Sequence, residues 1–85
     1  MLSDDVELHD WETTCYGKVK VVITLQNLFK SDDSIVIKPI NIFSEHSTVV
    51  AELEILINDS VQLFVVDVIK FNESNEISAI RAYKQ

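Results

Sequence analysis

Four apolar segments of strand length follow one another from residue 35 onward, separated by short polar clusters. The clusters consist mainly of Asn, Asp and Ser, because the sequence has only one Gly and one Pro with which to form turns. The segments are rich in Ile, Val and Phe, a composition typical of β-strands. They predict strands at Ile35–Phe43, Thr48–Ile57, Val61–Phe71 and Ile77–Lys84. Because the connections are short, we expect consecutive strands to pair as an antiparallel meander.

Two residues refine this meander. Pro39 interrupts the first segment, and a proline cannot donate a hydrogen bond to a neighbouring strand, so it predicts an edge strand or a bulge. The polar cluster at residues 72–76 has no Gly. Asn75 can adopt a positive φ at lower cost than most residues, so a tight turn is still expected there.

The first thirty residues give a less uniform pattern. Residues 6–11 alternate in polarity and predict a strand with Val6, Leu8 and Asp10 on one face. Residues 18–29 fit two structures. Their β-branched residues favour a strand, whereas two sets of apolar residues fall at helical spacing: Val22, Leu25 and Phe29, or Val21, Leu25 and Leu28. Propensity alone does not decide between the two.

Length, composition and charge restrict the class of protein. We expect one domain, 1–85, with a marginal core, since a chain this short buries only about 60–65% of its unfolded surface. The acidic N-terminus does not resemble a signal peptide, no apolar run is long enough to span a membrane, and the single Cys15 cannot form an internal disulfide. These features predict a cytoplasmic protein. The net charge of −7 argues against binding to nucleic acid or anionic membranes.

The clearest candidate for chemistry is Asp67. At strand period it shares a face with Val61, Leu63, Val65, Ile69 and Phe71. A carboxylate on an apolar face loses hydration, so it should find a partner, take up a proton or take part in chemistry. Three structural alternatives stay open: a bond from a backbone amide, an ion pair with Arg81, or solvation at the mouth of an open sheet. His9 and His46 have no second ligand at metal-binding spacing, so neither metal nor cofactor is expected.

Three segments resemble the NTF2-like superfamily in its ketosteroid isomerase and SnoaL-like branch. Residues 4–10, Asp-Asp-Val-Glu-Leu-His-Asp, resemble its "D-D-x-x-x-x-D" strand, and Tyr16-Gly17 resembles the start of its helix. Asp67 to Phe71 and Ile77 to Tyr83 resemble its final hairpin, "D-x-x-x-F" followed by "I-x-x-x-R-A-Y". The resemblance implies an α+β fold, a curved antiparallel β-sheet (β-α-β-β-β-β) packed on a helix in an NTF2-like (cystatin-like) cone. It also favours a helix over residues 18–29.

The resemblance implies a function for two carboxyl groups. In ketosteroid isomerase one Asp is a general base, and a second Asp stays protonated and donates a hydrogen bond to the enolate oxygen. By position, Asp10 matches the base and Asp67 matches the neutral donor. The expected function is binding of a small apolar carbonyl compound, with steroid delta-isomerase-like proton transfer if the chain is an enzyme. The expected ligand-binding residues are Val6, Leu8, Leu63 and Val65.

The chain also departs from the family. Two helices that precede Asp4 in the family, and the Tyr that they carry, have no counterpart here, and Leu25 stands where a supporting Tyr can occur. Without those helices the inner sheet face would be partly uncovered, which predicts a homodimer or higher homo-oligomer. The alternative function is therefore a non-catalytic ligand-binding or homo-oligomeric assembly module.

Overall fold

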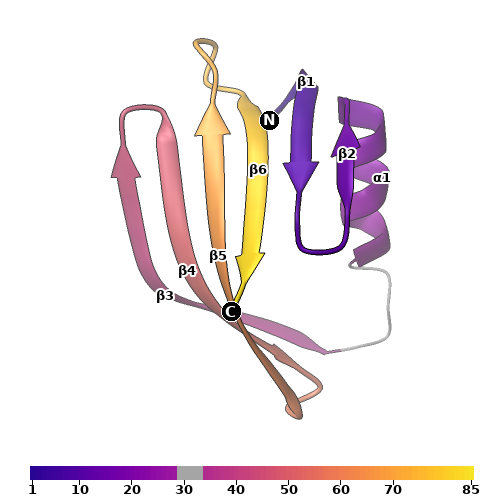
Figure 1. Ribbon diagram of the computed structural model, residues 1–85, viewed down its shortest axis with the longest axis vertical. Helices are drawn as coiled ribbons and strands as arrows, with labels where there is room; N and C mark the ends of the chain where they lie inside the picture. The colour runs from indigo at the N-terminus through magenta and orange to yellow at the C-terminus, as the bar shows by residue number, and fades with distance from the viewer. Residues whose placement is uncertain (29–33) are drawn as a thin grey trace.

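The computed structural model describes residues 1–28 and 34–85, which form one curved, unclosed six-stranded sheet and one helix (Figure 1). The sheet has the strand order β2-β1-β6-β5-β4-β3. The elements in chain order are β1 (Leu2–His9), β2 (Thr14–Tyr16), α1 (Lys18–Leu28), β3 (Ile35–Glu45), β4 (Thr48–Ile57), β5 (Val61–Phe71) and β6 (Ile77–Lys84).

The antiparallel meander is confirmed. Strands β4, β5 and β6 have the predicted bounds, β3 continues two residues further to Glu45, and neighbours from β3 to β6 pair antiparallel. Pro39 lies on the edge strand β3, where the register with β4 shifts between Pro39 and Asn41. Asn75 has a φ of 61°, as expected for the β5–β6 turn, and residues 46, 58 and 59 take positive φ in the other two hairpins. Asn and Asp therefore replace Gly at most of these positions.

The strand predicted at residues 6–11 is displaced, because β1 spans Leu2–His9 and residues 10 and 11 lie outside it. Two further details of the predicted sheet differ from the structure. The sheet is mixed, because β1 runs parallel to β6, with Leu8 opposite Ile80. A parallel pair needs a long connection, and here the whole meander between β1 and β6 supplies it. The second difference is the short strand β2, which pairs antiparallel with β1 and which the alternation of polarity did not predict.

Residues 18–28 form a helix, as the resemblance implied; Phe29 lies outside the described residues. Gly17 has a φ of 91°, which lets the chain turn from β2 into α1, and its amide donates to the carbonyl of Val6 over 2.8 Å. Val21 is fully buried against Val6 and Leu8, and Leu25 packs on the same cluster. Packing on β1 therefore stabilises a helix whose β-branched residues favour it little.

We call the face of the sheet on which α1 lies the inner face and the opposite one the outer face. Helix α1 contacts β1 and β2 and leaves β3 to β5 uncovered on this face (Figure 1). The strands bend, so side chains converge on the inner side: Val65 is 3% exposed, whereas Phe64, its outer neighbour, is 39% exposed. From β3 to β5 the inner face consists of Ile35, Ile37, Pro39, Ile42, Ser44, Val49, Ala51, Leu53, Ile55, Ile57, Val61, Leu63, Val65, Asp67 and Ile69.

Candidate functional site

Asp67 lies near the middle of the uncovered inner face. It pairs with Ala51 on β4 and with Ala82 on β6. These two methyl groups are the smallest side chains in that part of the face. The next residues along β5 on the same face are Val65 and Ile69, so the neighbours of the carboxyl group on this face are apolar.

The Asp67 carboxyl group is half-buried and has no side-chain hydrogen bond or ion pair with any residue of 1–28 and 34–85. The alternative of an ion pair with Arg81 is wrong, because Arg81 pairs with Val68 and therefore lies on the outer face. A backbone cap is likewise absent within the described part of the chain. Burial without a compensating partner raises the pKa of the Asp67 carboxyl above its ordinary value.

Asp10 has a different environment. It follows β1 at the start of the turn to β2, where its Oδ1 accepts the backbone amides of Glu12 at 2.8 Å and Thr13 at 2.5 Å. Its own amide donates to the Thr13 carbonyl over 2.9 Å. One carboxylate oxygen of Asp10 thus stabilises the β1–β2 turn, and the other is not used in these bonds.

Strand β6 separates the two carboxyl groups. Leu8 lies opposite Ile80 and His9 opposite Arg81, which brings the following residue, Asp10, level with Ala82. Ala82 in turn pairs with Asp67. Two strand spacings place the backbones of Asp10 and Asp67 about 10 Å apart, with the backbone of Ala82 between them. The topology therefore brings together two aspartates that are 57 positions apart in the sequence.

The four apolar residues expected at a ligand site fall into two groups. Val6 and Leu8 lie beneath α1, with 0% and 4% of their surface exposed, so the helix separates them from the open part of the inner face. Leu63 and Val65 lie on β5 in the same face as Asp67. Val65 is almost fully buried and forms part of the floor, and Leu63 is half-buried further along the strand. Ala51 and Ala82, which flank Asp67, were missed because only the register reveals them.

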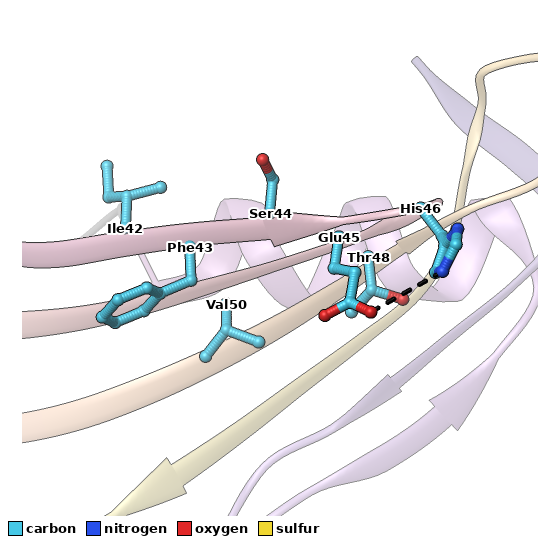
Figure 2. Close-up of a pocket in the computed structure, with 7 residues that line it drawn as sticks. All are labelled: Ile42, Phe43, Ser44, Glu45, His46, Thr48 and Val50. Atoms are coloured by element: carbon cyan, nitrogen blue, oxygen red, sulfur yellow. Dashed lines mark ion pairs between the residues drawn. The ribbon is translucent and has the colours of Figure 1, made fainter.

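A separate open cavity of about 730 Å³ lies at the β3–β4 hairpin and does not include either aspartate. Its lining residues are Ile42, Phe43, Ser44, Glu45, His46, Thr48 and Val50. Figure 2 shows Phe43 and Val50 on one side of the hairpin and Ile42 and Ser44 pointing the other way. Glu45 and His46 form a 3.6 Å ion pair at the exposed tip. No pattern in the sequence indicates this hollow, because it depends on how the hairpin bends.

The fold is shared with several solved structures. An NTF2-like protein of unknown function from Cytophaga hutchinsonii superposes with a TM-score of 0.86 at 17% identity, over 99% of this chain and 79% of that one. The chain has the NTF2-like fold. A ketosteroid isomerase-like protein from Kribbella flavida gives a TM-score of 0.83 at 9% identity, and an LEH-like epoxide hydrolase from M. tuberculosis gives 0.76 at 19%.

These similarities establish the fold and not the chemistry, since the sequence identity to each of these proteins is below 25%. The two enzyme-like matches cover 99% of this chain but only 60% and 65% of those proteins. No family model matches the sequence, and no curated protein matches it.

The remaining candidate groups of this NTF2-like domain are engaged in local contacts. His9 lies 3.0 Å from Glu7 and packs edge-on against Tyr16, and the Cys15 thiol lies 3.6 Å from the Thr24 hydroxyl. Within residues 1–28 and 34–85 no three His, Cys, Asp or Glu side chains are grouped as a metal site would require. No helix in the described part of the chain is long and apolar enough to cross a membrane.

Proposed function

We propose that this NTF2-like domain binds a small apolar carbonyl compound on its inner face, with Asp67 as a neutral hydrogen-bond donor. The observation that carries the proposal is the half-buried, unpartnered carboxyl group on an apolar face. A neutral carboxylic acid can donate to a carbonyl oxygen, and it binds more tightly as negative charge develops on that oxygen. The Ala51 and Ala82 methyl groups leave room for a flat ligand beside the acid.

Proton transfer is the reaction that this arrangement fits best. Asp10 would remove a proton from the carbon next to the ligand's carbonyl group, and the C–H electron pair would form the C=C bond of an enolate. The O–H of Asp67 would stabilise the enolate oxygen. Asp10 would then return the same proton to another carbon of the conjugated system. This sequence moves a double bond and needs no cofactor. The separation of about 10 Å between the two backbones leaves space for one small ring.

Binding is tested by an amide NMR titration with a planar phenol, which mimics the dienolate. Saturable shifts are expected around residues 49–53, 63–69 and 80–84, and at residues 9–11. Asp67→Leu should abolish these shifts because it removes the donor. Binding should weaken as the pH rises through the raised pKa of Asp67, because the ionised carboxylate cannot donate. If nothing moves at millimolar phenol, this function is refuted.

Catalysis is tested with a β,γ-unsaturated cyclic ketone, whose isomerisation to the conjugated ketone is followed by ultraviolet absorbance. Asp10→Asn is the informative variant. The Asn side-chain oxygen can still accept the Glu12 and Thr13 amides, so the turn should persist while the base is lost. Phenol binding without isomerisation in the wild-type protein would leave a ligand-binding domain and refute the enzymatic part.

An assembly module is the second candidate function. The observation that favours it is the extent of apolar surface on the inner face: α1 contacts β1 and β2, and within residues 1–28 and 34–85 no element packs on β3 to β5 from this side. In this case Asp67 would have no small-molecule ligand, and phenol would not bind to the wild-type protein or to any Asp67 variant. The phenol titration separates the two functions directly.

A further inference from the structure

We propose that Lys84 binds a carboxylate group on the ligand of the inner face. The ligand would then be a carbonyl compound that has an apolar body and an acidic end. The inference deepens the proposed function and rests on it, because it names the class of compound that would lie beside Asp67. Its starting point is a cation on a largely apolar face: Lys84 pairs with Val65, and the neighbouring inner-face pair on these two strands is Ala82 with Asp67.

The register of the sheet distinguishes Lys84 from the other cations of the strands. The strands carry four lysine and arginine residues: Lys38, Lys70, Arg81 and Lys84. The first three lie on the outer face, because they pair with residues of that face: Glu54, Ala79 and Val68. Lys84 lies on the inner face, because Val65 opposite it is part of the floor and is 3% exposed. The inner face of the strands therefore carries one positive charge, on the strand that separates Asp10 from Asp67.

Lys84 is a diagonal neighbour of Asp67. Asp67 lies opposite Ala82, and Lys84 follows Ala82 by two residues on the same face of β6. The backbones of diagonal neighbours in an antiparallel pair are about 7–8 Å apart. One small molecule that accepts a hydrogen bond from the Asp67 carboxyl group can therefore place its other end at the Lys84 ammonium group.

The Lys84 ammonium group contacts an aromatic ring and has no acidic partner among residues 1–28 and 34–85. Its Nζ lies 5.5 Å from the centroid of the Trp11 ring, whose face attracts a cation. The ion pairs within those residues involve the two histidines instead. A lysine ammonium group has three N–H donors, so a carboxylate can bind to it while the contact with the ring persists.

The backbone on both sides of this contact is held by hydrogen bonds. Trp11 lies in the β1–β2 turn, which Asp10 stabilises by accepting two backbone amides. Strand β6 stays paired beyond Lys84, since the Gln85 amide donates to the Phe64 carbonyl over 2.9 Å. A cation whose position is set before binding loses little conformational freedom when the ligand arrives. The arrangement is thus suited to recognition of an anionic group.

The acidic character of the whole chain acts weakly at this position. At physiological ionic strength, charges more than about 8 Å away are largely screened, so most of the net charge of −7 has little effect on a group bound at Lys84. Of the two carboxyl groups that the proposed function uses, Asp67 is neutral. Asp10 accepts two backbone amides, which offset part of its charge. Lys84 is therefore the main electrostatic contact for the acidic end of the ligand.

The test compares two ligands that differ in charge at one end, para-hydroxyphenylpropanoate and para-hydroxyphenylpropanamide. Both carry the phenol group that Asp67 would bind. In amide NMR titrations of the full chain at neutral pH, the acid should bind the wild-type protein about fivefold more tightly than the amide, which is the upper end for an exposed ion pair. Lys84→Met removes the charge and keeps most of the alkyl chain. In this variant binding of the acid should weaken to that of the amide, and binding of the amide should stay unchanged.

Three controls separate a direct contact from a change in structure or in overall charge. Lys70→Met removes an exposed lysine on the outer face of β5 and should leave the fivefold preference intact. Lys84→Arg keeps a cation that can also lie on the Trp11 ring, so it should retain the preference. Raising the salt concentration to about 1 M should reduce the preference in the wild-type protein, where no substitution perturbs the fold.

The same titrations distinguish this inference from the proposed function. If both ligands bind the wild-type protein equally and Asp67→Leu abolishes both, the proposed function stands and the inference is overturned. If the acid binds through Lys84 even in Asp67→Leu, and the amide does not bind at all, the anion site stands and the proposed function fails. A preference for the acid that persists in Lys84→Met overturns the inference as well. If neither ligand binds, both are refuted.

Discussion

Replacing Asp67 by Leu should stabilise the fold at neutral pH. The side chain is half-buried between Ala51 and Ala82, and no described residue provides it with a hydrogen bond. A catalytic or ligand-binding acid in such a place is a stability liability, whereas a structural aspartate would lose a bond when removed.

The size of the stabilisation by Asp67→Leu follows from how far the Asp67 side chain is buried. An unpaired polar group costs about 1–3 kcal/mol when fully buried, and because the Asp67 carboxyl oxygens still reach solvent the cost here should be at most about 1 kcal/mol. For a domain of this length, 1 kcal/mol corresponds to a shift in Tm of about 4–8 °C. Asp67→Leu should therefore raise Tm by up to that amount. Asp67→Asn, which removes the charge but keeps an unpaired amide, should raise it by less.

The stabilisation by Asp67→Leu should depend on pH. The pKa of Asp67 is raised in the folded state, so between the unfolded and folded pKa values the native protein holds a proton that the unfolded chain has released. The contribution of Asp67 to wild-type stability is thus greatest below the unfolded pKa and decreases as the pH rises through the folded pKa. The Leu variant lacks this decrease, so its advantage should be larger at pH 7 than at pH 4.

Thermal unfolding followed by circular dichroism at pH 4 and pH 7 measures both effects. Asp4→Asn is the matched control, because it removes one negative charge from an exposed position on β1 and should leave Tm nearly unchanged. A fall in Tm of several degrees for both Asp67 variants would mean that the carboxylate is structural. That result would remove the main support for the proposed function.

Three further predictions concern the fold, and chemical denaturation checks each of them. Val21→Ala should destabilise the domain by about 2 kcal/mol because Val21 is fully buried, whereas Val19→Ala, at a position 73% exposed in the same helix, should be neutral or slightly stabilising; equal effects would contradict the packing of α1. Gly17→Ala should cost about 1–2 kcal/mol through its φ of 91° alone, since an added Cβ meets no atom within 4 Å, and a neutral result would argue against that backbone conformation. Asn75→Ala should cost about 1 kcal/mol while Asn75→Gly should not, and a loss of stability in both would point to a role for the Asn side chain instead of its φ of 61°.

The succession of apolar, β-branched segments and short polar clusters by itself determines the meander. Composition and turn residues are local properties, so the bounds of β4, β5 and β6, the irregularity at Pro39 and the positive φ of Asn75 can all be predicted from short segments. The two-residue period of a strand places Asp67 on an apolar face. An acid among apolar residues is thus visible in the sequence, whereas the absence of an ion pair with Arg81 is not.

Tertiary structure decides the helix, the position of β1 in the sheet and the surroundings of Asp67, because each of these depends on contacts between distant segments. The helix over residues 18–28 forms where Val21 can pack against Val6 and Leu8, although its β-branched residues also suit a strand. The parallel pairing of β1 with β6 brings Asp10 level with Ala82, and through it with Asp67. The register between β5 and β6 pairs Arg81 with Val68, so Arg81 lies on the outer face and cannot form an ion pair with Asp67. This register depends on the pairing of two strands and cannot be read from either strand alone.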